Sequence, residues 1–274
     1  MSKLIVFYTF NPIFDYYDET LIRNDLNIVM LKMSIYTMQR ELGDKIEIRV
    51  YTTETELMTK ILSKYSCKIM LLKDEYVTGS ELKISDIVHR FKKAGHGRIF
   101  LLYDIIWNEN RPCLYLDNDT GICLGWGNKL YNGLLTLKTP AAWCTEQYNT
   151  IENWCYVSGA GYPNGWPRLI TGSGIRNNGI IFIPNNYNGR KCTRLIKEAY
   201  AELNDYYNKW NYGFDMTALT IVWDDYKFPL LLGDVHPVAF GLTHYYGQKY
   251  APYHQQLYQR NIQKWKNILE AYEN

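Results

Sequence analysis

Short apolar runs alternate with amphipathic stretches along the first quarter of the chain. Residues 3–9, 45–51 and 67–72 are rich in β-forming side chains, and each run is typical of a buried strand. Between them, apolar residues recur at steps of three and four over 26–42 and 55–65, a spacing that predicts amphipathic helices. Strands that alternate with helices predict an α/β fold whose parallel strands are joined by right-handed crossovers.

The pattern is less regular after this point. Helices are predicted over 84–93 and 98–107, divided by Gly95-His96-Gly97, and a short apolar strand then ends at Asp117. Residues 125–174 are rich in Gly, Trp, Asn and Pro and lack periodicity, which predicts long loops over one face of the sheet. The remaining predicted elements are a strand over 179–184 and helices over 190–209, 215–222 and 253–272.

Composition narrows the class of protein. The chain of 274 residues is 47% apolar and 21% charged, and it has no internal repeat, so we expect one globular domain over 1–274. A net charge of +2 gives no electrostatic case for nucleic acid as a partner. None of the six cysteines forms a C-x-x-C pair, so a structural zinc site is not expected. The N-terminus has no signal-peptide pattern and no transmembrane segment is visible, so we expect a soluble cytoplasmic protein with reduced thiols.

Two carboxylates, Asp117 and Asp119, follow the apolar run at 113–116. Alternation along a strand puts both on the same side of the backbone, where like charges repel. A hard divalent cation relieves this repulsion because it takes carboxylate oxygens as ligands. The alternative is a plain strand-to-turn junction, since Asp and Asn are common turn residues. The apolar run before the pair favours a Mg²⁺ or Mn²⁺ site at the end of a strand, where α/β sheets bind ligands.

Five other residues have chemistry that suits such a site. His244 is a competent Mn²⁺ ligand beside carboxylates, Gly247 would let the backbone approach a phosphate, and Lys249 would neutralise it. Both His244 and Lys249 also fit ordinary structural or surface roles. Arg98 is predicted at a helix start, where a cation is unfavourable unless an anion lies nearby, although a solvated arginine is the alternative. Asp215 is predicted at a helix N-cap, a role compatible with catalysis.

The segment Leu114–Asp119 resembles the Asp-x-Asp strand end of glycosyltransferases with the GT-A fold, and it is most similar to glycosyltransferase family 8. Matching segments follow in the family's order. They are Arg98 on the helix before that strand, Asn177-Asn178-Gly179 before a strand, Tyr212-Gly213-Phe214-Asp215 before a helix, and the late His244, Gly247 and Lys249. The family's Lys-Pro-Trp ending is absent, and the first strand ends without the family's acidic pair.

The resemblance implies a role for each matching residue. Asp117, Asp119 and His244 would hold the metal, and Asn178 and Asp215 would contact the transferred sugar near the reacting bond. Contacts with the nucleotide sugar are implied for Tyr8, Thr9, Arg98, Asn118, Gly247 and Lys249.

The resemblance also implies the fold and the reaction. It predicts a single GT-A domain with a mixed, mostly parallel sheet flanked by helices. It predicts a Mn²⁺- or Mg²⁺-dependent transferase that moves a hexose from a UDP-linked sugar to a hydroxyl of a glycan, protein or lipid, with retention. Two alternatives stay open. One is a nucleotidyltransferase, which would show a Gly-rich segment after the first strand, where Phe10–Phe14 stands. The other is a catalytically silent carbohydrate-binding protein that uses the Trp-rich loops.

Overall fold

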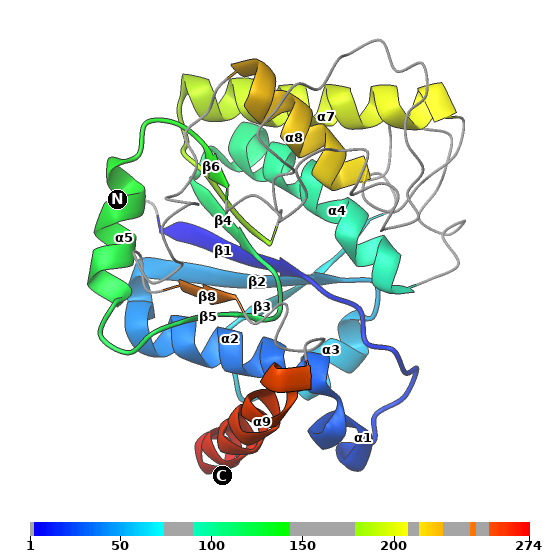
Figure 1. The fold of residues 1–274 in the computed structure, drawn as a ribbon, viewed down its shortest axis with the longest axis vertical. Coiled ribbons are helices and arrows are strands. Elements are labelled where there is room, and N and C mark those ends of the chain that lie inside the picture. The colour runs from blue at the N-terminus through cyan, green and yellow to red at the C-terminus, as the bar shows by residue number, and fades with distance from the viewer. Residues whose placement is uncertain (1–2, 74–89, 143–178, 208–213, 227–241, 245–251) are drawn as a thin grey trace.

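The centre of the fold is a six-stranded sheet. The computed structural model describes residues 3–73, 90–142, 179–207, 214–226, 242–244 and 252–274 of the chain (Figure 1). In this part of the chain the strands lie in the order β3-β2-β1-β4-β7-β6. Their bounds are β1 Leu4–Thr9, β2 Ile46–Thr52, β3 Lys68–Leu71, β4 Cys113–Leu116, β6 Ala141–Ala142 and β7 Ile180–Ile183.

The sheet is mixed and mostly parallel, as the sequence predicts. β1 pairs in parallel with β2 and with β4, and β2 pairs in parallel with β3. Only β7 runs the other way, since it is antiparallel to both β4 and β6. β4 and β7 are buried along their whole length, which is why they read as continuous apolar runs rather than as alternating ones.

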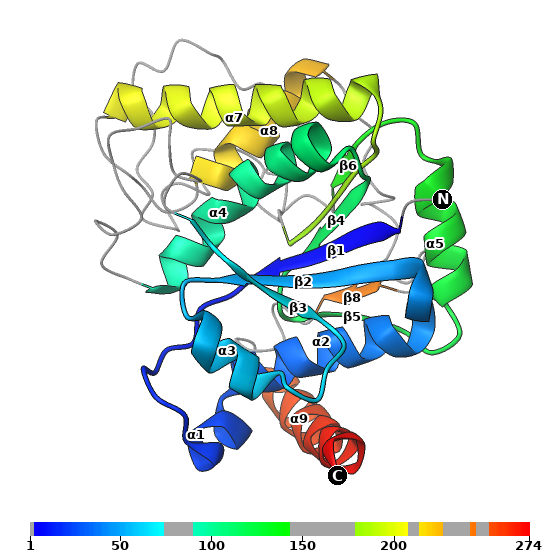
Figure 2. The same ribbon diagram turned by 180° about the vertical axis from the view of Figure 1, so that it is seen from behind.

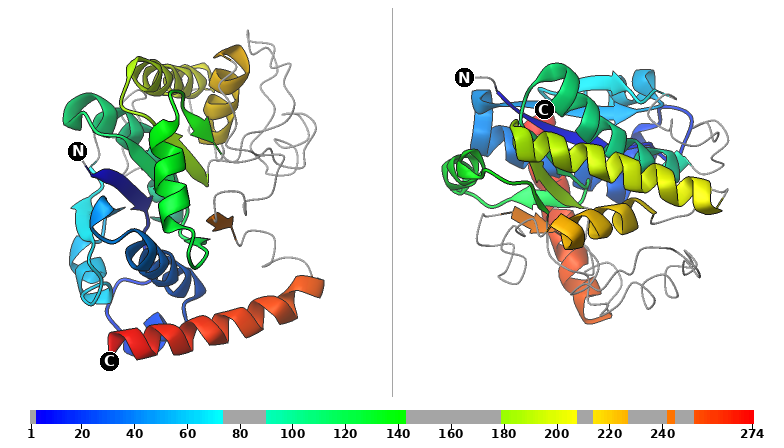
Figure 3. Two further views of the ribbon diagram at one scale, coloured as in Figure 1. Left: turned by 90° about the vertical axis from the view of Figure 1, so that its left-hand side faces the viewer. Right: turned by 90° about the horizontal axis from the view of Figure 1, so that it is seen from above.

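Helices cover both faces of the sheet (Figures 1 and 2). On one side lie α2, α3 and α9, with the short helix α1 and the segment η1; on the other lie α4, α7 and α8. Figure 3 shows α7 along the outer side of α4, with α8 beside it. The bounds are α1 Glu19–Asn24, α2 Leu26–Leu42, η1 Gly43–Lys45, α3 Thr55–Ile61, α4 Arg90–Asp104, α7 Tyr187–Tyr207, α8 Phe214–Tyr226 and α9 Pro252–Glu273.

Two apolar cores flank the sheet, and side-chain alternation along β1 assigns residues to each. Leu4, Val6 and Tyr8 point into the core shared with α2 and α3. Ile5 and Phe7 point into the core shared with α4, α7 and α8. All five are fully buried. Alternate residues of β1 therefore pack against opposite layers of helices.

The helix α2 has the bounds that the sequence predicts. The Asp25 carboxylate caps its start by accepting the Ile28 N–H at 2.9 Å. Gly43 ends it with a φ of +49°, a conformation that favours glycine. Most of the helix is buried, because it packs on the sheet and on α9 as well.

The predicted break at Gly95-His96-Gly97 is wrong. The helix α4 runs through these residues from Arg90 to Asp104 and continues as the π-helical segment η4, Ile105–Glu109. A Cβ at Gly97 would stand 2.3 Å from Leu72 Cδ1, so a side chain here would require Leu72 to move. Arg98 is therefore inside a helix and not at its start. Residues 84–89 of the predicted first helix lie outside the described residues.

The predicted loop region also contains regular structure. The helix α5, Gly127–Thr136, and the strand β6 lie within 125–142, and residues 143–174 are outside the described part of the chain. Leu130 and Leu134 are buried one turn apart, and this short apolar stripe is the signal that the Gly-rich composition concealed. Other predicted helices differ from the observed ones only at their ends, by a few residues.

Replacing Gly127 by Ala should destabilise the protein. A Cβ at this position would stand 2.1 Å from the Glu41 backbone oxygen, so α2 or α5 would have to shift. We expect the free energy of unfolding to fall by about 1–3 kcal/mol, the usual range for overpacking. Urea denaturation measures it, with Asn132→Ala on the exposed side of α5 as the control. An Ala variant as stable as the wild type would show that the two helices do not pack this closely.

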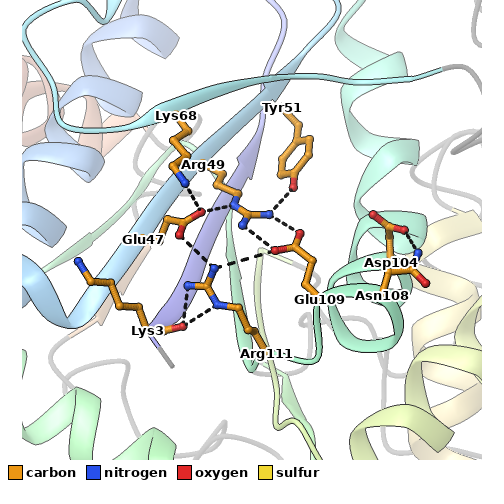
Figure 4. A network of polar contacts seen from close by, with 9 residues as sticks. All are labelled: Lys3, Glu47, Arg49, Tyr51, Lys68, Asp104, Asn108, Glu109 and Arg111. Atoms are coloured by element: carbon orange, nitrogen blue, oxygen red, sulfur yellow. Dashed lines mark hydrogen bonds and ion pairs between the residues drawn. The ribbon is translucent and has the colours of Figure 1, made fainter. Parts of the chain in front are cut away.

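A network of charges lies at the amino ends of the parallel strands (Figure 4). Arg49 bonds both Glu109 carboxylate oxygens, one of them at 2.7 Å, and also bonds Glu47 at 2.7 Å. Arg111 bonds Glu47 at 3.0 Å, and Lys68 bonds it at 3.1 Å. Burial alone would raise the pKa of Glu47, but the hydrogen bonds from Arg49, Arg111 and Lys68 outweigh it and lower the pKa to about 2. The network ties β2 to the segment between η4 and β4.

None of the helices in the described part of the chain combines the length and the apolar character that crossing a bilayer requires.

Candidate active site

The site lies at the carboxyl ends of two neighbouring parallel strands. β1 ends at Thr9 and β4 ends at Leu116, and the pairing of Phe7 with Tyr115 puts both ends at one edge of the sheet. Thr9 Oγ1 lies 3.4 Å from the Tyr115 hydroxyl. The backbone N–H of Asp117 donates to the Gly179 oxygen at 2.7 Å, so the start of β7 is fixed beside the same edge.

Arg98 joins two carboxylates that are far apart in the sequence. Its Nε donates to Asp215 Oδ2 at 2.8 Å, and its Nη2 also bonds this oxygen. Its Nη1 lies 3.3 Å from Asp117 Oδ1. The guanidinium thus links α4, α8 and the end of β4. The side chains of Arg98 and Asp215 are 13% and 7% exposed, whereas Asp117 is 29% exposed.

Tyr115 supports the contact between Arg98 and Asp117. Its hydroxyl donates to Asp117 Oδ1 at 2.6 Å and accepts from Arg98 Nη1 at 3.2 Å. The guanidinium also lies over the Tyr115 ring, 5.4 Å from the ring centroid. Burial, and then the Asp117 charge, raises the pKa of Tyr115, so the phenol keeps its proton and remains a donor.

The Arg98 guanidinium keeps its proton and its positive charge. Burial by itself lowers the pKa of the Arg98 guanidinium, but Asp215, Tyr115 and Asp117 outweigh burial and raise the pKa above its ordinary value. A buried cation between two carboxylates leaves this group of three charges at −1. The arrangement can therefore attract a further cation, and it can offer a guanidinium to an anionic ligand.

The segment after β4 brings the second carboxylate next to a distant strand. Asn118 and Asp119 form a turn in which the Thr120 N–H donates to the Asp117 backbone oxygen at 3.1 Å, and Asp119 is 5% exposed. β5, Thr120–Ile122, pairs antiparallel with β8, Leu242–His244. In this register His244 is opposite Thr120, the residue that follows Asp119. The backbone of His244 therefore lies one residue along the ladder from Asp119.

The residues predicted as metal ligands suit Mn²⁺ or Mg²⁺ in their chemistry. Asp117 and Asp119 offer hard carboxylate oxygens, and the backbone of His244 lies beside them. The side chain of His244 is not among those that the structure describes. Among the side chains that are described, no three His, Cys, Asp or Glu groups form a ligand set.

The other predicted residues lie in four different surroundings. Thr9 lies at the edge with Asp117, as already described. Tyr8 is fully buried on the opposite side of β1, where its hydroxyl bonds Ser34 Oγ at 2.8 Å, so the Tyr8 side chain does not belong to the cluster. The Asn118 amide donates to the Asn27 oxygen at the start of α2, at 3.2 Å. The residues outside the described part of the chain are Asn178, Gly247 and Lys249.

Two details differ from the sequence-based expectation. Asp215 is the second residue of α8 and lies in its first turn, so it is not the N-cap, and its carboxylate bonds Arg98. Tyr115 was missed as a candidate. Its position two residues before Asp117 was the available signal, because alternation puts both side chains on the same side of the strand. An apolar run hides such a residue, since buried tyrosines are also ordinary core residues.

No protein-family model matches the sequence, and no curated protein matches it. Solved structures are similar at low sequence identity. Mouse xyloside xylosyltransferase 1, in its apo form, is 11% identical with a TM-score of 0.47, over 83% of this chain and 83% of that one. The apo form of the glycosyltransferase GlyE of Streptococcus pneumoniae TIGR4 is 16% identical with a TM-score of 0.41, over 84% of this chain and 44% of that one. These similarities are too distant to assign an activity.

Proposed function

We propose that this protein is a metal-dependent glycosyltransferase of the GT-A type, which moves a hexose from a nucleoside-diphosphate sugar to a hydroxyl acceptor. The observation that carries the proposal is the cluster at the carboxyl ends of β1 and β4. There Arg98 links Asp117 to Asp215, and the β5–β8 pairing brings His244 next to Asp119. A cluster of acidic side chains around one buried cation, at the ligand-binding edge of an α/β sheet, suits a charged donor.

The proposed cation ligands are Asp117, Asp119 and His244. A divalent cation bound there would neutralise charge on the diphosphate that leaves. Arg98, Gly247 and Lys249 would bind the diphosphate itself, as would backbone near Thr9 and Asn118. Once they are bonded to the diphosphate, Arg98 and Lys249 would stabilise the developing charge without further reorganisation.

The proposed reaction moves the sugar C1 from a diphosphate oxygen to the acceptor oxygen. The bond between the sugar C1 and the diphosphate oxygen breaks, and its electron pair stays on the diphosphate. The acceptor oxygen forms the new bond to C1, and its proton passes to the departing diphosphate. Asp215 and Asn178 would hold the sugar hydroxyls during this step, near an oxocarbenium-like transition state. We extend the proposal to a UDP-linked donor and to retention of configuration at C1, on the strength of the family 8 resemblance in the sequence alone.

A thermal-shift screen of UDP, UDP-glucose, UDP-galactose and UDP-xylose, each with and without Mn²⁺, tests the proposal. A ligand that binds only the folded state raises the melting temperature. At a ligand concentration of a hundred times its Kd, it stabilises the folded state by about 2.7 kcal/mol. We expect a rise with at least one donor, and a larger rise when Mn²⁺ is present. Adenosine diphosphate and guanosine diphosphate are the controls that test whether binding depends on the uracil base. No shift with any donor, with or without Mn²⁺, would argue against the proposed function.

A further inference from the structure

Arg98 bonds Asp117, the carboxylate that the proposed function assigns to a divalent cation, and the same guanidinium is the proposed ligand of the diphosphate. Its guanidinium carries a positive charge that is paired with the Asp117 carboxylate. The same guanidinium has a second carboxylate partner in Asp215. A divalent cation that uses Asp117 as a ligand must therefore compete with Arg98, and an anionic ligand that binds Arg98 must compete with both carboxylates.

We propose that Arg98 is a built-in counter-ion that couples cation binding to donor binding. This inference rests on the proposed function, because it takes Asp117 as a cation ligand and a diphosphate as the ligand of Arg98. Without the donor, the guanidinium neutralises Asp117 and weakens cation binding. When the diphosphate arrives, the guanidinium bonds phosphate oxygens, and the Asp117 carboxylate is released to the cation.

The geometry around Arg98 suits such an exchange. Guanidinium groups bond both carboxylate and phosphate oxygens through two parallel N–H groups. The contact with Asp117 is the longer one, at 3.3 Å, and it uses one nitrogen, whereas Asp215 takes bonds from two. The bond to Asp117 is therefore the easier one to break, while Asp215 continues to hold the Arg98 guanidinium in place.

Tyr115 keeps Asp117 in position throughout the exchange. Its hydroxyl donates to Asp117 at 2.6 Å, which is shorter than the Arg98 contact with the same oxygen. The carboxylate therefore stays oriented when the guanidinium turns away.

Linkage gives the exchange a measurable form. If Arg98 repels the cation in the absence of donor and binds the diphosphate in its presence, then the nucleotide tightens cation binding, and the cation tightens nucleotide binding by the same factor. Couplings of this type are commonly 5- to 150-fold, and we expect about tenfold. A pre-formed metal site that ignored Arg98 would show no dependence of this coupling on the guanidinium.

Mn²⁺ titration followed by electron paramagnetic resonance of the free ion measures the coupling without turnover. The proteins are the wild type, Arg98→Gln, Asp215→Asn and the double variant Arg98→Gln/Asp215→Asn, each with and without UDP. Arg98→Gln should bind Mn²⁺ about tenfold more tightly than the wild type when UDP is absent, and UDP should then add little. Asp215→Asn should bind Mn²⁺ more weakly. Without the Asp215 charge, Arg98 pairs more strongly with Asp117, and this pairing competes with the metal ion.

The double variant keeps the test decisive if Arg98→Gln alone does not fold. It removes one charge of each sign, and it should bind Mn²⁺ more tightly than Asp215→Asn, again without much help from UDP. Circular dichroism confirms that each variant is folded.

Two outcomes overturn the inference, and they differ. If variants without the Arg98 charge bind Mn²⁺ with their parents' affinity, and UDP still tightens binding by the same factor, then Arg98 is not the coupling group and the metal site stands. If none of the four proteins binds Mn²⁺, with or without UDP, then the metal dependence in the proposed function is wrong and the inference falls with it.

Discussion

Asp117→Asn should lower the kcat of hexose transfer by about 10²–10³-fold at saturating Mn²⁺, the range typical of losing one main electrostatic group of a transition state. The substitution keeps the size of the side chain, and its amide oxygen can still accept the hydrogen bond from Tyr115. It removes the charge that would bind the cation and that now bonds Arg98. A transfer assay with the donor identified by thermal shift, run over a range of Mn²⁺ concentrations, measures the change.

The control for this variant is Asp44→Asn, since Asp44 is an exposed carboxylate in η1, directly after α2. We expect it to transfer hexose at the wild-type rate. Full turnover by Asp117→Asn would refute the central role of the carboxylate. If the wild type binds glycans, catalyses no transfer and binds glycans equally well with Asn at 117, the protein is a carbohydrate-binding protein instead.

The sequence predicts the layers of the fold well because period and length suffice for them. The spacing of Ile28, Leu31, Ile35 and Leu42 can only form one buried face as a helix, and α2 has the predicted bounds. The apolar runs that became β1, β2 and β4 are too short for helices and lead to turns. The predictions failed where glycine has a packing role. Gly97 lies inside α4 with Leu72 in the space that a side chain would take, and the local sequence contains no sign of that neighbour.

The site is only partly readable from the sequence, for a related reason. Asp117 and Asp119 stand out because two carboxylates end an apolar run, and this local signal needs no partner. The bond between Arg98 and Asp215 spans 117 positions, and it depends on how α4 and α8 pack over the sheet. Composition and periodicity do not encode that distance. Arg98 was predicted from the family resemblance and from its supposed place at a helix start. The helix start was wrong, yet the anion that this argument required is present as two carboxylates.

Replacing Arg49 by Met should lower the free energy of unfolding by about 3–5 kcal/mol, the cost of breaking a buried ion pair on one side. The Arg49 side chain is 8% exposed and bonds Glu47 and Glu109 from a central position (Figure 4). Met fills similar volume, so the loss reports charge rather than a cavity. The two carboxylates would be left partly buried with weaker partners. Urea denaturation at neutral pH measures the loss from the midpoint and slope.

Lys68→Met is the matched control, because Lys68 bonds the same Glu47 oxygen but is 63% exposed, and exposed ion pairs contribute about 0–1 kcal/mol. Arg49→Met/Glu109→Gln should recover part of the lost stability, since it removes a carboxylate that has lost its main partner. A loss in Arg49→Met no larger than in Lys68→Met would mean that the network contributes little to stability. A large loss without recovery in the double variant would instead point to the lost hydrogen bond from Arg49 to the Tyr51 hydroxyl. Because the network lies at the amino ends of the strands, the folded variants should keep their affinity for the donor, which separates the framework of the sheet from the chemistry at its other edge.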